Sequence, residues 1–120
     1  MTPPNRVKLR RSYLFAPGNN AKLLGKVFDA GADAVVLDLE DAVPPGQKPN
    51  AREMVRELLA GREPAIAPGV FVRVNHPSTE WWRDDVAAVV CPALTGIRLP
   101  KVNRVQEVER VADLLDEVEP

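Results

Sequence analysis

Short apolar runs alternate along this chain with longer segments in which apolar residues recur every three or four positions. Val35, Val36 and Leu37 form the most apolar run, with no polar residue between them. Such a run, rich in β-branched residues, is typical of a parallel strand that is covered on both faces. Three further runs end at or near a proline, which closes a strand. The pattern therefore predicts strands at 12–16, from Ala34 onward, at 70–75 and at 96–100.

Helical periodicity fills the intervals between these strands. In the segment 21–30, Leu23, Leu24, Val27 and Phe28 form the expected buried stripe, and Gly31 follows as a helix terminator. Three more helices are predicted: one over about 49–60 with Met54, Val55, Leu58 and Leu59 inward; one capped by Ser78 or Thr79 and carrying Trp81, Trp82, Val86, Val89 and Val90; and one capped by Asn103 and carrying Val105, Val108, Val111 or Ala112, Leu115 and Val118. Because the two tryptophans are adjacent, at most one faces the core.

Four alternations of strand and helix, at about 30 residues each, indicate consecutive βα units with a parallel sheet. A complete (β/α)₈ barrel requires about 250 residues, and this chain has 120. We therefore predict an α/β fold: the first four βα units of a TIM barrel, with residues 1–120 as a single N-terminal half-barrel segment and the C-terminal half absent. Unpaired strand edges favour a fragment, a split product or an obligate oligomer. The alternative is an open flavodoxin-like sheet, in which the strand order reverses after the first strand.

Three carboxylates follow the most apolar run within four residues: Asp38, Glu40 and Asp41. In a βα architecture the carboxyl ends of the strands line the active site, so these acids are expected at its mouth. For Asp41 alone, capping of the next helix is the more ordinary role. Three acids around Leu39 favour a functional site.

Composition restricts the partners. Sixteen basic and seventeen acidic residues nearly cancel, which offers no electrostatic reason to expect nucleic acid or a membrane surface as a partner. No apolar run approaches the roughly 20 residues that cross a bilayer, and no apolar segment follows the basic start of the chain as in a secretory signal. The single Cys91 cannot form an internal disulfide and fits a reducing cytosol. We expect a cytoplasmic protein.

Five motifs, in chain order, resemble the N-terminal motifs of the citrate lyase β-subunit group of the HpcH/HpaI aldolase superfamily, which includes malyl-CoA and citramalyl-CoA lyases. They are Arg11–Gly18, Leu37–Val43, Gln47–Arg52, Val72–Asn75 and Leu99–Lys101. The resemblance implies a TIM barrel, Mg²⁺ as cofactor, and a trimeric or hexameric homo-oligomer. Its implied partners are CoA or acyl-carrier thioesters and small keto or hydroxy acids. The implied reaction cleaves a β-hydroxyacyl thioester of the citryl-CoA, malyl-CoA or citramalyl-CoA type to acetyl-CoA, or a related thioester, and a keto acid.

Arg73 is the candidate catalytic and substrate-binding cation. The implied cleavage passes through an enolate beside a thioester carbonyl, and a nearby cation stabilises that charge. The resemblance puts Arg73 in the active site. Independently, an arginine between Val72 and Val74 on an apolar strand requires an anion. That anion is either the substrate or, as structural glue, Asp38 or Glu40.

The other candidate roles also come from the resemblance. Glu40 and Asp41 are catalytic candidates. Together with Asp38, they are expected either to hydrogen-bond to the metal's ligands and waters without binding the metal directly, or to orient Arg73. The family's primary Mg²⁺ ligands follow strands five and six, so no direct metal ligand is expected in this chain. We therefore predict that these 120 residues alone neither bind Mg²⁺ tightly nor cleave a thioester. A non-catalytic half-barrel that binds an anion or a partner subunit is the alternative.

Five further residues are expected to bind substrate. Arg11 and Lys48 occupy basic positions within the motifs, near the CoA phosphates, and Lys101 follows the fourth strand toward the same mouth. Pro17 and Gly18 open a helix, so backbone N–H groups there can hold a phosphate or carboxylate. Such a loop is more often a tight turn followed by an asparagine cap.

Overall fold

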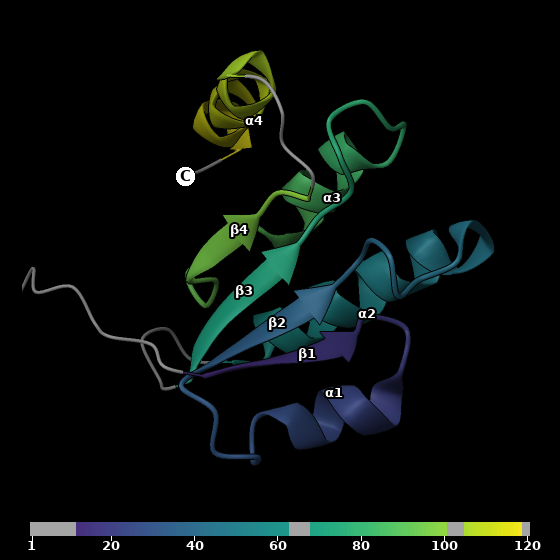
Figure 1. Ribbon diagram of the computed structural model, residues 1–120, viewed down its shortest axis with the longest axis vertical. Coiled ribbons are helices and arrows are strands. Elements are labelled where there is room, and N and C mark those ends of the chain that lie inside the picture. Colours follow the sequence, from purple (N-terminus) through teal and green to yellow (C-terminus); the bar gives the residue numbers. More distant parts are fainter. Residues whose placement is uncertain (1–11, 63–67, 101–104, 119–120) are drawn as a thin grey trace, which may run out of the picture.

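Four parallel strands form one sheet in the computed structural model, which describes residues 12–62, 68–100 and 105–118. The strands are β1 (Tyr13–Pro17), β2 (Ala34–Asp38), β3 (Gly69–Arg73) and β4 (Gly96–Arg98), in the order β1-β2-β3-β4 (Figure 1). The helices alternate with them: α1 (Ala21–Val27), α2 (Lys48–Ala60) preceded by the short 3-10 helix η1 (Pro45–Gln47), α3 (Trp82–Val89) and α4 (Val105–Val118).

This strand order confirms the predicted fold class. Each strand pairs in parallel with the next one along the chain, as in the first four units of a TIM barrel. An open flavodoxin-like sheet is excluded for the described strands, because that sheet requires the order to reverse after β1. All four predicted strands and helices are present, with ends that differ by a few residues from the expected ones.

One face of the sheet packs against the helices and forms the core. Alternate residues of β2 and β3 point to that face because side chains of a strand alternate between its two sides. They meet the apolar stripes of the helices in a single buried cluster, which includes Val35, Leu37, Val70 and Val72 from the strands and Leu24, Val55, Leu59, Val86, Val89 and Leu114 from the helices. Trp82 is buried in this cluster and Trp81 is half-buried, so one of the two tryptophans faces the core.

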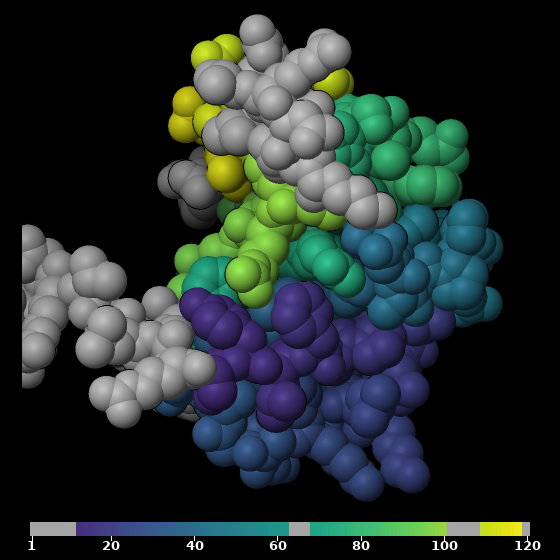
Figure 2. All heavy atoms as spheres, in the orientation of Figure 1, coloured from purple at the N-terminus to yellow at the C-terminus, as the bar shows by residue number. Residues whose placement is uncertain are grey.

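The other face of the sheet carries aromatic and basic side chains. The register aligns Phe15 with Phe71 through the intervening β2 residue, and Arg73 with Arg98. Tyr13 and Phe15 are 42% and 51% exposed, and the guanidinium of Arg98 lies 5.0 Å from the ring centroid of Tyr13. Figure 2 shows side chains of β1 (purple) beside those of β4 (yellow-green) on this face. It corresponds to the inner face of a barrel.

Two local predictions were wrong. The helix α3 begins at Trp82 and is not capped by Ser78 or Thr79, because both of those side chains are used in the preceding turn. Ser78 contacts the His76 ring, and the Thr79 hydroxyl donates to the His76 carbonyl. In α1, Leu23 is exposed rather than buried, and the helix ends at Val27. Because α1 is short, only Leu24 and Val27 of this helix are buried against the sheet.

Candidate active site at the carboxyl ends of the strands

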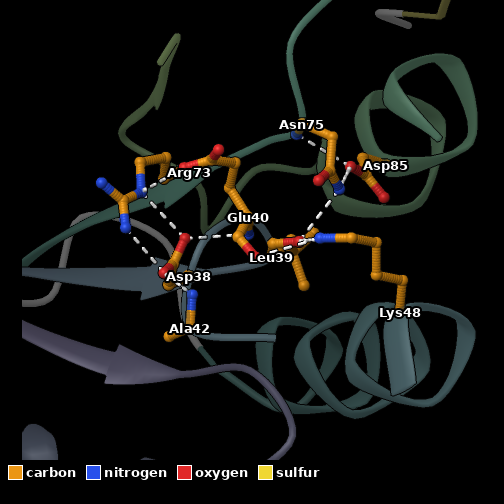
Figure 3. A network of polar contacts seen from close by, with 8 residues as sticks. All are labelled: Asp38, Leu39, Glu40, Ala42, Lys48, Arg73, Asn75 and Asp85. Carbon is orange, nitrogen blue, oxygen red and sulfur yellow. Dashed lines mark hydrogen bonds and ion pairs between the residues drawn. The ribbon is translucent and has the colours of Figure 1, made fainter. Parts of the chain in front are cut away.

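Asp38, the last residue of β2, is the buried acid at the centre of the site. Its Oδ1 accepts from Arg73 Nε at 2.9 Å and its Oδ2 from Arg73 Nη2 at 2.7 Å, so the pair is bidentate (Figure 3). The register places the two residues opposite each other at the ends of β2 and β3. The backbone N–H groups of Glu40 and Ala42 donate to the same carboxylate, at 2.9 and 3.0 Å. Asp38 is therefore fully hydrogen-bonded as an anion.

The sequence predicted either a substrate or a neighbouring carboxylate as the anion bound by Arg73, and the pair with Asp38 is the second of these. It does not use up Arg73, whose side chain remains 27% exposed and lies with its guanidinium carbon 5.2 Å from the ring centroid of Phe15. A guanidinium has five N–H donors, and Asp38 takes two of them. Arg73 thus keeps donors for a second anion at the strand ends.

The two charges stabilise one another's ionised forms. Burial by itself would raise the pKa of Asp38, but the hydrogen bonds from Arg73 and from the Glu40 and Ala42 N–H groups outweigh it and hold that pKa below its ordinary value. The hydrogen bond to Asp38 likewise raises the pKa of Arg73. Both groups therefore stay charged across the physiological range.

Glu40 lies between Arg73 and Asp41. One carboxylate oxygen of Glu40 is 3.7 Å from Arg73 Nε, and the side chain is largely buried. Burial, followed by the interactions with the neighbouring Asp41, raises the pKa of Glu40. Asp41 itself is exposed. The structure therefore brings Asp38, Glu40 and Arg73 together, with a carboxylate beside the arginine that accepts a proton more readily than an ordinary glutamate.

The Pro17–Gly18 turn packs directly against the turn 38–41, which carries the three acids and is called the acidic turn below. The Gly18 N–H donates to the Asp38 carbonyl at 2.7 Å, and a Cβ on Gly18 would lie 2.8 Å from that carbonyl oxygen. Only glycine permits so close an approach. Because this N–H is engaged, it is not available to hold an anion. Asn20 then caps α1, accepting from the Leu23 N–H at 3.0 Å, so the loop is a tight turn with an asparagine cap.

The basic residues differ in where the structure places them. Lys48 begins α2 and is only 5% exposed, and its Nζ donates to the carbonyls of Leu39 and Glu40, both at 3.0 Å. Burial lowers the pKa of Lys48, and the nearby carboxylate of Asp85 opposes that effect most strongly. Its substrate contact stays a prediction. Arg11 and Lys101 lie outside the described residues, so their roles also stay predictions.

Sequence reasoning missed a polar group behind the site, made of Asn75, Asp85 and Arg52. Asp85 is fully buried and accepts from the Asn75 backbone and side chain and from Arg52 Nε. A signal was present: Asp85 follows Trp82 by three positions and precedes Val89 by four, which places it on the buried stripe of α3 rather than among solvated acids.

The described carboxylates do not form a magnesium site. Within residues 12–62, 68–100 and 105–118, no group of three histidine, cysteine, aspartate or glutamate side chains is arranged to hold a metal ion. Asp38, the most buried of the three acids, has its oxygens engaged by Arg73 and backbone N–H groups. Magnesium needs near-octahedral oxygen ligation, which these residues do not supply. In the same part of the chain, no helix is long and apolar enough to span a membrane.

Known proteins resemble this chain in sequence. A "Citrate lyase subunit beta-like protein" of Deinococcus radiodurans is 43% identical over 115 residues, covering 91% of this chain and 39% of the relative. A "(3S)-malyl-CoA thioesterase" of Cereibacter sphaeroides is 42% identical over 112 residues, covering 90% of this chain and 38% of the relative. This chain thus spans well under half the length of these relatives.

Solved structures also resemble this chain. The citrate lyase beta subunit of Mycobacterium tuberculosis, complexed with oxaloacetate and magnesium, superposes with a TM-score of 0.69 and 34% identity, covering 83% of this chain and 42% of that one. Another structure of the Mycobacterium tuberculosis protein, with the same TM-score and identity, contains magnesium, acetoacetate and coenzyme A and is covered over 35% of its length. The sequence profile described as HpcH/HpaI aldolase/citrate lyase matches residues 11–120, and the chain therefore belongs to that family.

Proposed function

We propose that this chain is the N-terminal part of a Mg²⁺-dependent carbon–carbon lyase. The reaction cleaves a β-hydroxyacyl thioester, of the citryl-CoA, malyl-CoA or citramalyl-CoA type, to acetyl-CoA or a related thioester and a keto acid. The observation that carries the proposal is Arg73: a partly exposed guanidinium, held in a bidentate pair with Asp38 at the carboxyl ends of the strands. Family membership and the oxaloacetate, acetoacetate and coenzyme A bound by relatives support it.

The geometry suits charge stabilisation at a thioester. Breaking the bond between the α- and β-carbons leaves the electron pair on the thioester enolate, while the β-hydroxyl gives its proton to a general base and becomes the carbonyl of the keto acid. A proton returned to the α-carbon of the enolate then gives the product thioester. The remaining N–H donors of Arg73 are suited to the developing oxyanion because Asp38 holds the guanidinium plane in advance of the reaction. Such pre-orientation avoids reorganisation during the chemical step.

Glu40 and Asp41 are proposed to support this cation. A carboxylate oxygen of Glu40 lies 3.7 Å from Arg73 Nε, and burial and Asp41 raise the pKa of Glu40, so that it takes up a proton more readily than an ordinary glutamate. Magnesium, when bound by the complete protein, supplies a Lewis acid for the keto-acid oxygens. Its ligands are proposed to come from outside these residues, because the described acids do not form a site.

The remaining substrate contacts are proposals as well. Arg11 and Lys101 are proposed to contact the thioester and its carrier. The exposed aromatic residues of β1 support the further proposal that these 120 residues are a half-barrel, since such a face requires a cover from further barrel units or from a partner. The complete protein is proposed to be a cytoplasmic homo-oligomer.

The test is a cleavage assay on a species of known mass. Malyl-CoA, citramalyl-CoA and citryl-CoA are offered with Mg²⁺ to the purified 120-residue chain and to a chain extended by any in-frame downstream codons, and keto-acid release is followed. We expect no turnover by the 120 residues and turnover by the extended chain. Arg73→Met should lower kcat/KM by about 10²–10³-fold, whereas Arg83→Met, which removes an exposed helix arginine, should not.

Two results would contradict the proposal. One is an extended protein that cleaves none of the three thioesters; binding of an anion without cleavage would then favour the non-catalytic half-barrel. The other is cleavage that Arg73→Met leaves unchanged. Turnover by the 120-residue chain itself would refute the expectation that it is inactive alone.

A further inference from the structure

A second polar cluster approaches the acidic turn from the side opposite Arg73. In Figure 3, Arg73 and Asp38 lie on one side of the Leu39–Glu40 backbone, while Lys48, Asn75 and Asp85 lie on the other. Lys48 Nζ donates to the carbonyls of Leu39 and Glu40, each at 3.0 Å. The carbonyls that it binds belong to the residues immediately after Asp38, so its contact is with the backbone that carries the site.

Asn75 reinforces the same carbonyl. Its Nδ2 donates to the Leu39 oxygen at 2.9 Å and to Asp85 Oδ2 at 2.6 Å, and its backbone N–H donates to Asp85 Oδ2 at 3.0 Å. Asp85 is in turn held by Arg52 Nε, at 3.0 Å from Oδ1. Lys48 of α2 and Asn75 after β3 thus both bind the Leu39 carbonyl, while Asp85 of α3 and Arg52 of α2 hold Asn75 from behind.

The turn is fixed at consecutive backbone groups. The Asp38 carbonyl accepts from Gly18, the Leu39 N–H donates to the Arg73 carbonyl at 2.9 Å, and the Glu40 N–H donates to the Asp38 carboxylate. Lys48 donates to the Leu39 and Glu40 carbonyls, and Asn75 donates to the Leu39 carbonyl as well. A loop that only connects β2 to η1 needs no such constraint, and burying a lysine and an aspartate for it is unfavourable.

The consequence of this restraint falls on Glu40. With both its N–H and its carbonyl held, the Glu40 side chain has a defined origin, from which its carboxylate lies 3.7 Å from Arg73 Nε. A shift of the turn by a fraction of an ångström would change that separation. Precision of this kind is what supporting groups provide for catalytic side chains.

We propose that Lys48 and Asn75, braced by Asp85 and Arg52, are positioning residues that hold the turn 38–41 so that Glu40 faces Arg73. Lys48 acts through two backbone carbonyls and not by touching the thioester. The catalytic consequence rests on the proposed lyase function, whereas the structural part can be tested without any activity.

The first experiment measures amide hydrogen exchange in the 120-residue chain by NMR, with circular dichroism to establish folding. Lys48→Met keeps the aliphatic stem and removes the donors, Lys48→Arg keeps charge and donors, and Lys26→Met is the matched change at an exposed lysine. We expect exchange of the Glu40 and Ala42 amides to accelerate by roughly tenfold or more in Lys48→Met, while exchange of the β3 amides in that variant stays as in the parent. In Lys26→Met, none of these exchange rates should change. Lys48→Arg should restore most of the protection.

Asn75→Ala provides a second variant if Lys48→Met does not fold, and the same two amides should again exchange faster. Unchanged exchange in the folded variants would overturn the proposal. In any species of this protein that cleaves a thioester, Lys48→Met should lower kcat by roughly 10–100-fold at nearly constant KM. A raised KM with unchanged kcat would overturn it too, because Lys48 would then contact substrate. If no species is active, the lyase function fails while hydrogen exchange still decides the role of the turn.

Discussion

Asp38→Asn tests whether the carboxylate at the end of β2 is an anion held by Arg73. The change keeps shape and one side-chain oxygen, but it leaves a guanidinium beside a neutral amide. Removing one partner of a buried pair typically destabilises by 3–5 kcal/mol. Arg73 is 27% exposed, so solvent screens part of that effect. We therefore expect a loss of about 2–3 kcal/mol, a large part of the 5–15 kcal/mol that usually holds a domain together.

The pH dependence has a definite sign. The pKa of Asp38 is lower in the folded chain than in the unfolded one, so its stabilisation is fully present above the unfolded pKa, about 3.9, and is lost as the pH falls through the folded value. The difference between parent and Asp38→Asn should therefore be largest near pH 7 and shrink below about pH 4.

Urea unfolding followed by circular dichroism at several pH values measures both effects. Asp84→Asn is the matched control, because the Asp84 side chain is 75% exposed and lies 4.0 Å from Arg52; it should change stability by less than about 0.5 kcal/mol. A double-mutant cycle with Arg73→Met isolates the pair. A coupling below about 0.5 kcal/mol, or a difference that does not depend on pH, would refute the reasoning.

Two further predictions concern the turn around this pair. Gly18→Ala should destabilise the fold by about 1–3 kcal/mol in urea unfolding, because the new methyl group meets the Asp38 carbonyl at 2.8 Å. The control Gly25→Ala, in α1 with nothing within 4 Å of a Cβ, should instead stabilise the fold by about 0.5–1 kcal/mol. Equal changes in the free energy of unfolding for the two variants would contradict the close approach of Gly18 to that carbonyl. Glu40→Gln should stabilise at pH 7 by less than about 1 kcal/mol, because burial and Asp41 raise the pKa of Glu40 and make its ionised form unfavourable. That gain should vanish near pH 3, where Glu40 is protonated in both states, and a loss of stability at pH 7 would count against it.

Much of the fold was predictable because burial in βα units is a local pattern. The uninterrupted run Val35–Leu37 is buried as expected, and the stripes of α2 and α3 face the sheet. The helix starts were less predictable. Ser78 and Thr79 have the residue types of a cap, yet their side chains bond to His76, and only the geometry of the turn decides between those uses.

The candidate site divides in the same way. That Asp38, Glu40 and Arg73 lie together was predictable, because parallel strands end at one edge of the sheet. Which of the acids forms the bidentate pair with Arg73 was not predictable, since several arrangements of acids and arginine satisfied the same pattern. The position of Lys48 was also not predictable: a basic residue at a helix start is usually solvated, and here the fold buries its ammonium on two carbonyls.

The sequence by itself determined the α/β class, the order of the elements and the strand end at which polar groups gather. These follow from side-chain periodicity and from the short apolar runs, which act over a few neighbouring residues. The tertiary structure alone decided which charges pair and which are buried. Arg73 reaches Asp38 across 35 residues, and Arg52 reaches Asp85 across 33. Such contacts depend on the twist of the sheet and the packing of α2 against α3, because desolvation and hydrogen-bond geometry are set by whatever the completed fold brings near.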